Sequence, residues 1–134
     1  MALLEHTTWE VRTTGDDSNG GAFDAVSGVP GTDYSQQDAA QITFTDLVID
    51  AVTNTNVTSA AFPFAAAHVG NIINITSGTG WTVGRYQVIS VTGVIATLDR
   101  SPGAVGITGG NGKLGGALAS PGRLAAEIIG GNHA

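Results

Sequence analysis

Residues 70–100 carry the pattern that most restricts how this chain can fold. Their sequence, GNIINITSGTGWTVGRYQVISVTGVIATLDR, contains three runs of alternating apolar and polar side chains, separated by glycine-containing stretches. Alternation with a period of two places the apolar side chains of a run on one face of a β-strand. We therefore predict three strands, with Thr92-Gly93 as a two-residue hairpin turn between the last two. The strands span residues 71–76, 85–92 and 94–99.

The apolar side chains of these strands are expected to pack together and to form most of the core. Twenty glycines and many β-branched residues accompany the pattern, and long helix-forming stretches are missing. Such a composition is typical of short strands joined by tight turns. We therefore predict an all-β protein with a small β-sandwich or β-barrel core over residues 42–101, in which the central apolar residues are Ile73, Ile75, Tyr86, Val88, Val91, Ile95 and Leu98.

The stretch QITFTDLVIDA predicts another strand, in which the alternation changes phase. Ile42 and Phe44 share one parity, whereas Leu47 and Ile49 share the other. A β-bulge near Thr45–Asp46 would keep all four side chains on the core side. Further along, a single helical turn is predicted around residues 64–68, because a proline directly precedes this stretch.

An N-terminal arm is predicted over residues 1–41. Residues 7–13 alternate and predict one short strand, with Trp9 and Val11 on the same face. The following residues 14–41 form a stretch that is too long for an ordinary connection in a compact domain. We expect another subunit to order this stretch, with its isolated apolar side chains in pockets of that partner. These side chains are Phe23, Val26, Val29 and Tyr34.

A glycine-rich C-terminal arm is predicted over residues 102–134. Eight glycines lie in GAVGITGGNGKLGGALASPG, which favours a linker or an arm over core structure. A short amphipathic helix is expected in GRLAAEIIGG, using Leu124, Ile128 and Ile129, with Gly130 as its stop. The two arms together give the residues predicted to contact another subunit, which are Trp9, Phe23, Val26, Val29, Tyr34, Leu114, Leu118 and Leu124.

Acidic residues are concentrated in the first part of the chain. Residues 1–50 hold nine of the eleven acids and one of the five bases, a net charge of −8, whereas residues 51–134 carry +2. Such asymmetry can steer association with a complementary surface. It argues against a nucleic-acid partner, because nucleic acids bind clustered Lys and Arg.

Several other classes of protein are disfavoured by the sequence. It contains no cysteine, which excludes disulfides and thiolate metal sites. No apolar run reaches the ~20 residues that a membrane-spanning helix needs. The start, MALLEHTTWE, lacks the basic and apolar regions of a signal peptide. We expect a soluble protein made in a cytoplasm, with no membrane partner.

Residues 16–24, DDSNGGAFD, look like an oxygen-rich cation loop. Counted from Asp17, however, the sixth position of an EF-hand would be Ala22 instead of glycine, and the twelfth would be Gly28 instead of glutamate. Asn19-Gly20 is a favoured turn dipeptide. We therefore favour a turn, with a cation site as the lesser alternative.

The other motifs do not assemble a catalytic or cofactor site. In GITGGNGKL, Ile107 and Leu114 occupy positions where a phosphate-binding loop requires Gly and Ser or Thr. His6, His68 and His133 lack the spacing of metal ligands, and no serine lies in a nucleophile elbow. We expect no enzymatic activity, no metal and no cofactor.

Trp9, Trp81 and Tyr86 could form a sugar-stacking platform. Packing in the core or in an interface is the favoured interpretation, because aromatic side chains bury large areas. A carbohydrate-binding module is kept as an alternative function on the strength of these rings.

Several strings together resemble a module that recurs in virion proteins of tailed bacteriophages. They are TWEVRTTGDDSNGGAFD, GTDYSQQDAAQ, VGNIINITSGTGWTVGRYQVISV, ATLDRSPG and GKLGGALASPG, and they extend over most of residues 8–122. In larger relatives this module precedes a right-handed β-helix of the pectate-lyase-like kind, as in tail-fibre or tailspike-type proteins. Here the chain stops at Ala134, where the β-helix would begin.

The resemblance implies an anchoring module that acts as a small virion component. In plan, a free-standing acidic domain with long arms is similar to a capsid decoration (cement) protein, which sits over capsomer junctions, often as a trimer. The resemblance thus implies location in the virion, binding to the major capsid protein or another virion protein, and self-association as a homotrimer. A tail, neck or fibre-adaptor subunit is the alternative.

Overall fold

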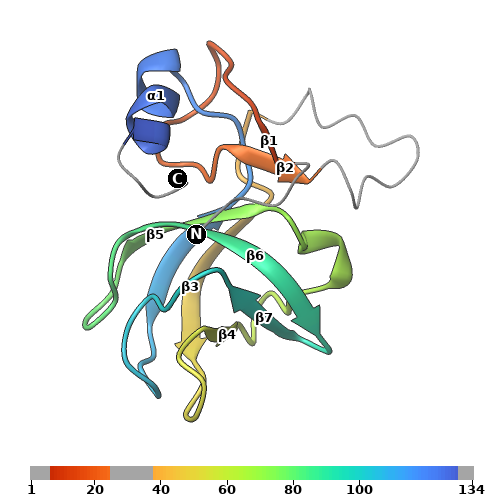
Figure 1. The fold of residues 1–134 in the computed structure, drawn as a ribbon, viewed down its shortest axis with the longest axis vertical. Helices are drawn as coiled ribbons and strands as arrows, with labels where there is room; N and C mark the ends of the chain where they lie inside the picture. The colour runs from red at the N-terminus through yellow and green to blue at the C-terminus, as the bar shows by residue number, and fades with distance from the viewer. Residues whose placement is uncertain (1–6, 25–37, 130–134) are drawn as a thin grey trace.

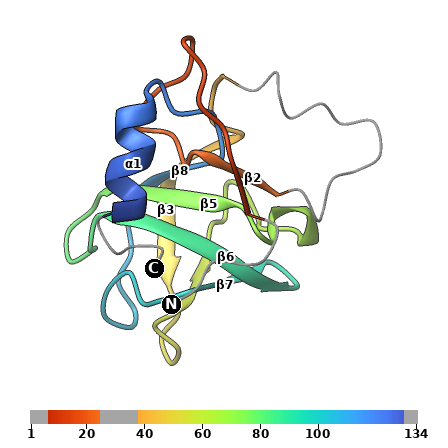
Figure 2. The same ribbon diagram turned by 45° about the horizontal axis from the view of Figure 1, so that its top comes forward.

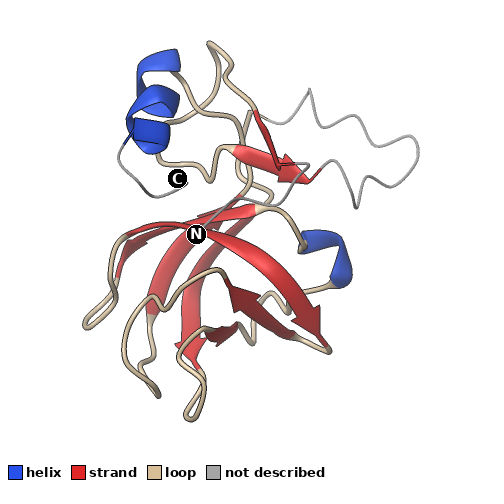
Figure 3. Ribbon diagram, in the orientation of Figure 1, coloured by secondary structure: helices blue, strands red, loops and turns tan. Residues whose placement is uncertain are grey.

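The computed structural model describes residues 7–24 and 38–129 (Figure 1). Six antiparallel strands close into a barrel with the order β3-β4-β7-β6-β5-β8. The predicted all-β class is confirmed, and of the two predicted architectures the barrel is the one observed (Figure 3). The strands span β3 Ile42–Ile49, β4 Asn56–Thr58, β5 Ile72–Ser77, β6 Gly84–Thr92, β7 Ile95–Leu98 and β8 Gly110–Leu114.

Among residues 7–24 and 38–129, two strands and two helical segments lie outside the barrel. β1 (Thr7–Trp9) pairs antiparallel with β2 (Ala22–Asp24). A one-turn 3₁₀-helix, η2 (Ala66–His68), and a short α-helix, α1 (Pro121–Ile129), complete the fold. They match the predicted helical turn around residues 64–68 and the predicted short C-terminal helix. The predicted helix stop at Gly130 lies outside the described residues.

The core lies inside the barrel and follows from the apolar alternation of its strands. In β3, the side chains of Phe44, Leu47 and Ile49 are fully buried. The pairing of β3 with β8 shifts register between Phe44 and Leu47. This confirms the predicted β-bulge near Thr45–Asp46, which lets side chains of both parities face the core.

The strands predicted in residues 70–100 are confirmed as well. β5 pairs with β6 and β6 with β7, and every strand boundary lies within one residue of its predicted position. Val88 of β6 lies opposite Leu98 of β7, and both side chains are buried. At the predicted Thr92-Gly93 turn, Gly93 has a φ of +61°, which glycine adopts without strain.

The predicted core of residues 42–101 is too short, because β8 belongs to the barrel. β8 pairs with β3 on one side and β5 on the other, and so closes the barrel. Its sequence, Gly-Asn-Gly-Lys-Leu, lacks the alternation of large apolar side chains that marks a buried strand. Its glycines are needed for close packing, since a Cβ at Gly110 would lie 2.5 Å from the indole of Trp81. The predicted C-terminal arm over residues 102–134 is therefore wrong as far as Leu114. This residue ends β8, and its side chain is fully buried.

A second layer covers the outer face of β5, β6 and β8 (Figures 1 and 2). We call it the terminal layer and define it as residues 7–24 together with residues 115–129. It contains β1, β2 and α1, and both segments run next to one another above the barrel (Figure 2). The hydroxyl of Ser120 accepts a hydrogen bond from the Arg123 amide at 3.2 Å and so caps the start of α1.

Candidate interaction surfaces

Backbone hydrogen bonds join the two segments of the terminal layer. The amide of Arg12 donates to the carbonyl of Leu118 at 2.9 Å. The amide of Gly20 donates to the carbonyl of Gly115 at 2.8 Å. A Cβ at Gly20 would overlap the carbonyl of Ile72 in β5, so this stretch lies directly on the barrel.

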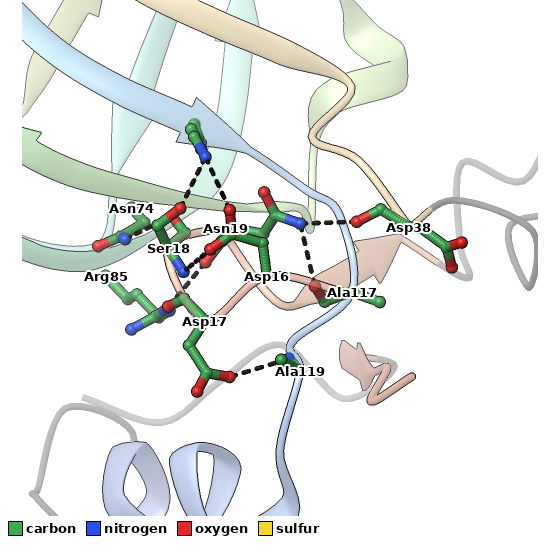
Figure 4. A network of polar contacts seen from close by, with 10 residues as sticks. Asp16, Asp17, Ser18, Asn19, Asp38, Asn74, Arg85, Ala117 and Ala119 are labelled. Carbon is green, nitrogen blue, oxygen red and sulfur yellow. Dashed lines mark hydrogen bonds and ion pairs between the residues drawn. The ribbon is translucent and has the colours of Figure 1, made fainter. Parts of the chain in front are cut away.

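Arg85 of β6 holds the N-terminal segment against the barrel. Its side chain is fully buried. Its guanidinium donates to the backbone carbonyls of Asp17 at 2.6 Å, Asn19 at 2.7 Å and Gly20 at 3.1 Å. Because charged donors make stronger hydrogen bonds than neutral ones, these contacts fix the turn in place. Figure 4 shows the network around this turn.

Two asparagine side chains complete the attachment (Figure 4). Asn19 is buried, and its amide nitrogen donates to the carbonyls of Asp38 at 2.8 Å and Ala117 at 3.0 Å. From β5, the amide nitrogen of Asn74 donates to the carbonyl of Ser18 at 2.7 Å. Asn19 therefore forms part of the predicted turn and also connects three parts of the chain.

These contacts correct the prediction of a long N-terminal arm. Residues 15–21, which we expected to contact another subunit, are bonded to the barrel and to residues 115–118 of the same chain. The prediction failed because the attachment uses backbone carbonyls and glycines, which leave no apolar pattern in the sequence. Residues 25–37, the centre of the predicted arm, lie outside the described residues.

The predicted contact residues fall into three groups. Leu114 and Leu118 are fully buried within the chain, so their assignment to an interface with another subunit is wrong. Trp9 and Leu124 are half-buried. Phe23 lies in β2, where only the backbone is described, and Val26, Val29 and Tyr34 lie outside the described residues.

Several aspartates of the acidic part of the chain accept hydrogen bonds from backbone amides. The Asp17 carboxylate accepts from the amides of Ala119 at 2.9 Å and Ser120 at 3.1 Å, which ties the turn to the start of α1. Asp50 accepts from the amides of Val52 at 2.9 Å and Thr53 at 2.8 Å. The Asp50 contacts form an Asx turn, which stabilises the local chain reversal. This finding gives the acids a role within the fold that charge counting did not reveal.

Hydrogen bonding holds the pKa values of several aspartates below their ordinary value. The hydroxyl of Ser59, with the amides of Ala61 and Ala60, lowers the pKa of Asp46. The hydroxyl of Thr14 and the guanidinium of Arg12 lower the pKa of Asp38. Each carboxylate is favoured in its charged form because its partners donate to it.

A polar pocket of about 400 Å³ lies at the edge of the terminal layer. Its lining includes Thr14, Asp16, Thr43 and Lys113. The ammonium of Lys113 already donates to the hydroxyl of Ser18 at 2.6 Å and pairs with Asp16 at 3.4 Å. These contacts satisfy the charged groups of the wall and point to a structural role.

Of the three aromatic rings considered for sugar stacking, Trp81 and Tyr86 are buried and Trp9 is half-buried. Trp81 is 7% exposed and Tyr86 is 2% exposed. The indole nitrogen of Trp81 donates to the carbonyl of Thr108 at 3.1 Å. The guanidinium of Arg100 lies 4.2 Å from the centroid of the Tyr86 ring, in a cation–π arrangement. Neither Trp81 nor Tyr86 presents a face to a saccharide.

Exposed apolar side chains lie in the connections at the barrel end where β3, β5 and β7 finish. We call these connections the loop pole and define it as residues 50–55, 78–83 and 99–109. They contain Val52, which is 86% exposed, Val83, which is 62% exposed, and Val105, which is 47% exposed. Its charged residues are Asp50, Asp99 and Arg100, of which Asp99 is buried. Single valines carry no signal in a sequence, so this surface could only be found once the strand order was known.

No protein-family model, curated protein or solved structure matches this chain. Within residues 7–24 and 38–129, no group of three or more acidic or histidine side chains could hold a metal ion. The same residues include no helix long and apolar enough to cross a membrane.

Proposed function

We propose that this chain is a structural protein of a tailed-bacteriophage virion and acts as a capsid decoration (cement) protein. In this role it sits on the assembled shell, binds the major capsid protein and stabilises contacts between neighbouring subunits. The proposal rests on the sequence resemblance over most of residues 8–122 and on one structural observation, the two separate surfaces formed by the terminal layer and the loop pole.

Two surfaces of the domain differ in chemistry. On one, the terminal layer holds Asp24 in β2 and ties Asp38 to Arg12 and to the side-chain amide of Asn19. These residues flank residues 25–37, which carry Val26, Val29 and Tyr34 from the predicted contacts. The other surface is the loop pole, where Val52, Val83 and Val105 are exposed. A subunit that bridges neighbours in a shell needs contact surfaces at more than one place, and this construction supplies two.

Location and copy number in the particle test the proposal. A reconstruction of the virion, combined with quantitative mass spectrometry of purified particles, should place hundreds of copies on the capsid surface. Particles lacking the protein should release their DNA at a lower temperature than complete particles, and added purified protein should restore the difference. Absence of the protein from the shell would contradict the proposal.

A tail, neck or fibre-adaptor subunit is the second candidate function. It is favoured by the position of the resembling module ahead of β-helix domains in fibre-type proteins. The same copy-number measurement separates the two, because a few to dozens of copies would assign the chain to the tail. The carbohydrate-binding alternative has lost the observation that motivated it, since the Trp81 and Tyr86 rings are buried.

A further inference from the structure

The dipeptide Asn19-Gly20 carries a chemical reactivity that its role in the turn does not use. An asparagine before a glycine loses its side-chain amide readily, because glycine has no Cβ to hinder the approach of its backbone nitrogen. The Gly20 nitrogen bonds to Cγ of Asn19, the Cγ–Nδ2 bond breaks, and ammonia leaves with the proton of the Gly20 amide. Water then opens the cyclic imide at either of its carbonyl carbons and gives aspartate or isoaspartate at position 19.

Contacts of the folded protein block this reaction at both reacting groups (Figure 4). The backbone amide of Gly20 donates to the carbonyl of Gly115 at 2.8 Å, so its proton is held in a hydrogen bond. The side-chain nitrogen of Asn19 donates to two carbonyls, at 2.8 Å and 3.0 Å, which prevents the side chain from rotating toward the Gly20 nitrogen. Asn19 is also only 1% exposed, so the imide carbons would be shielded from water.

Arg85 fixes the backbone on both sides of the reacting bond. Its guanidinium donates to the carbonyls of Asn19 at 2.7 Å and Gly20 at 3.1 Å. Cyclisation requires the backbone between the two residues to rotate, and these hydrogen bonds hold the carbonyls that would turn. The terminal layer must therefore leave the barrel before the imide can form. Since we expect the layer and the barrel to unfold together, the reactive state is the unfolded chain.

Neither product of the reaction fits the folded structure. A carboxylate at position 19 would face the carbonyls of Asp38 and Ala117, which now accept from the amide. Isoaspartate adds one atom to the main chain directly before Gly20, where even a Cβ would lie 2.1 Å from the carbonyl oxygen of Ile72. Because ammonia is lost, refolding cannot restore the amide.

We propose that Asn19 is a deamidation site: the folded terminal layer protects its amide, and chains that stay unfolded lose it irreversibly. Such chains lack the donor that connects the turn with Asp38 and Ala117. The unfolded state is then consumed by a chemical step, as in other proteins whose unfolded chains are modified before they refold. This inference goes beyond the proposed function, because it concerns the chain itself and not its place in a particle.

Deamidation rates in the folded and the unfolded protein test the protection. Wild-type protein is incubated at mildly alkaline pH in buffer and in denaturing urea, and peptide mass spectrometry follows the conversion of amide to acid at Asn19. Asn111-Gly112, the second Asn-Gly dipeptide of the chain, is the matched reference. In urea, the two sites should react at rates that agree within about threefold, because neither has a fixed environment. In buffer, Asn19 should react at least about 100-fold more slowly than in urea, because the reaction then waits for unfolding.

Loosening the attachment should speed the reaction. Arg85→Met, which removes the donor to both carbonyls, should raise the Asn19 rate in buffer at least about tenfold, whereas Arg123→Met should leave it unchanged. Wild-type protein at urea concentrations just below its unfolding transition gives the same comparison without a substitution. Its Asn19 rate should rise in proportion to the unfolded population, which covers the case in which Arg85→Met does not fold.

Refolding tests the consequence of the modification. Protein that is partly deamidated in urea is diluted to the urea concentration at which half of the unmodified chains fold, and a short protease pulse removes unfolded chains. Chains with aspartate or isoaspartate at position 19 should show a folded-to-unfolded ratio at least about tenfold lower than unmodified chains. Aspartate at position 111 is the control and should refold like the unmodified chain, because the Ser77 hydroxyl can donate to it.

Three results would overturn the inference. The first is an Asn19 rate in buffer equal to that in urea, and the second is the absence of any reaction at Asn19 in urea. The third is refolding of chains modified at position 19 as readily as unmodified chains. The experiments use the free protein, whereas the proposed function is tested by the location of the protein in the particle, so either can fail without the other.

Discussion

The guanidinium of Arg85 donates to the backbone carbonyl of Asn19 at 2.7 Å, and both side chains are buried. Arg85 lies in β6, and Asn19 lies in the turn of the terminal layer, 66 residues earlier in the chain. Through this contact and its neighbours, the terminal layer and the barrel form one folded unit. The stability of the barrel should therefore depend on residues that precede its first strand.

Arg85→Met should reduce the free energy of unfolding by about 3–5 kcal/mol, because three backbone carbonyls, two of them in the buried residues Asn19 and Gly20, lose a charged donor. Urea denaturation followed by tryptophan fluorescence measures the change. Arg123→Met, on the exposed start of α1, is the control and should change stability by less than about 0.5 kcal/mol. Equal effects of the two substitutions would refute the role assigned to Arg85.

Gly20→Ala should destabilise the protein by about 3 kcal/mol or more, because its Cβ would overlap the backbone carbonyl of Ile72. The same substitution at Gly122 is the control, since a Cβ there has no heavy atom within 4 Å. Gly122→Ala should be neutral or slightly stabilising. Thermal melting of both variants gives the comparison, and a neutral Gly20→Ala would show that the turn does not lie on β5.

Asn19→Asp should destabilise the protein by about 2–4 kcal/mol. The new carboxylate would face the carbonyls of Asp38 and Ala117, which now accept from the Asn19 amide. Asn111→Asp is a matched control, because Asn111 also precedes a glycine, but its amide donates to the exposed hydroxyl of Ser77. An aspartate at position 111 can accept from that hydroxyl, so its cost should stay below about 0.5 kcal/mol.

These predictions concern contacts that the sequence could not reveal, whereas much of the barrel could be predicted. Alternation in residues 70–100 and the phase change between Phe44 and Leu47 directly reflect side chains facing a core. β8 and the terminal layer are built from glycine and backbone hydrogen bonds. Gly110 and Gly20 are glycines because Trp81 and Ile72 lie against them, and such partners become visible only in three dimensions.

His68 should make stability depend on pH near neutrality. Burial lowers its pKa below the ordinary value of 6.5, and its Nδ1 accepts from the Ala65 amide at 3.0 Å, which requires the unprotonated ring nitrogen. Between its folded pKa and 6.5, the unfolded state binds more protons than the folded state. The stabilising contribution of neutral His68 is therefore complete above pH 6.5. The free energy of unfolding falls as the pH decreases below that value.

Urea midpoints at several pH values between 8 and 5 measure this effect. His68→Asn is the informative variant, because the asparagine oxygen can accept from the Ala65 amide without titrating. Its midpoint should fall less than that of the wild type over this interval. If both proteins show the same pH dependence, His68 is not its source.

We expect four hydrogen-bonded aspartates to determine how strongly the protein is destabilised at acidic pH. Hydrogen bonds lower the pKa values of Asp16, Asp38, Asp46 and Asp50 below the ordinary value of 3.8. The contribution of the ionised aspartates to the free energy of unfolding is complete above pH 3.8. It is lost as the pH falls through the lowered pKa values of the folded state. Asp46→Asn should therefore flatten the pH dependence of the melting temperature below pH 4. An unchanged acid profile would contradict the assignment.

The central claim is that the terminal layer and the barrel unfold together, and native-state hydrogen exchange tests it most directly. The amides of Arg12, Gly20 and Gly21 donate to carbonyls of residues 115–118, whereas the amide of Leu98 belongs to the barrel. We predict that all four amides exchange with the same free energy, that of global unfolding. Exchange of the first three at the rates of an unstructured chain, with Leu98 still protected, would contradict the account.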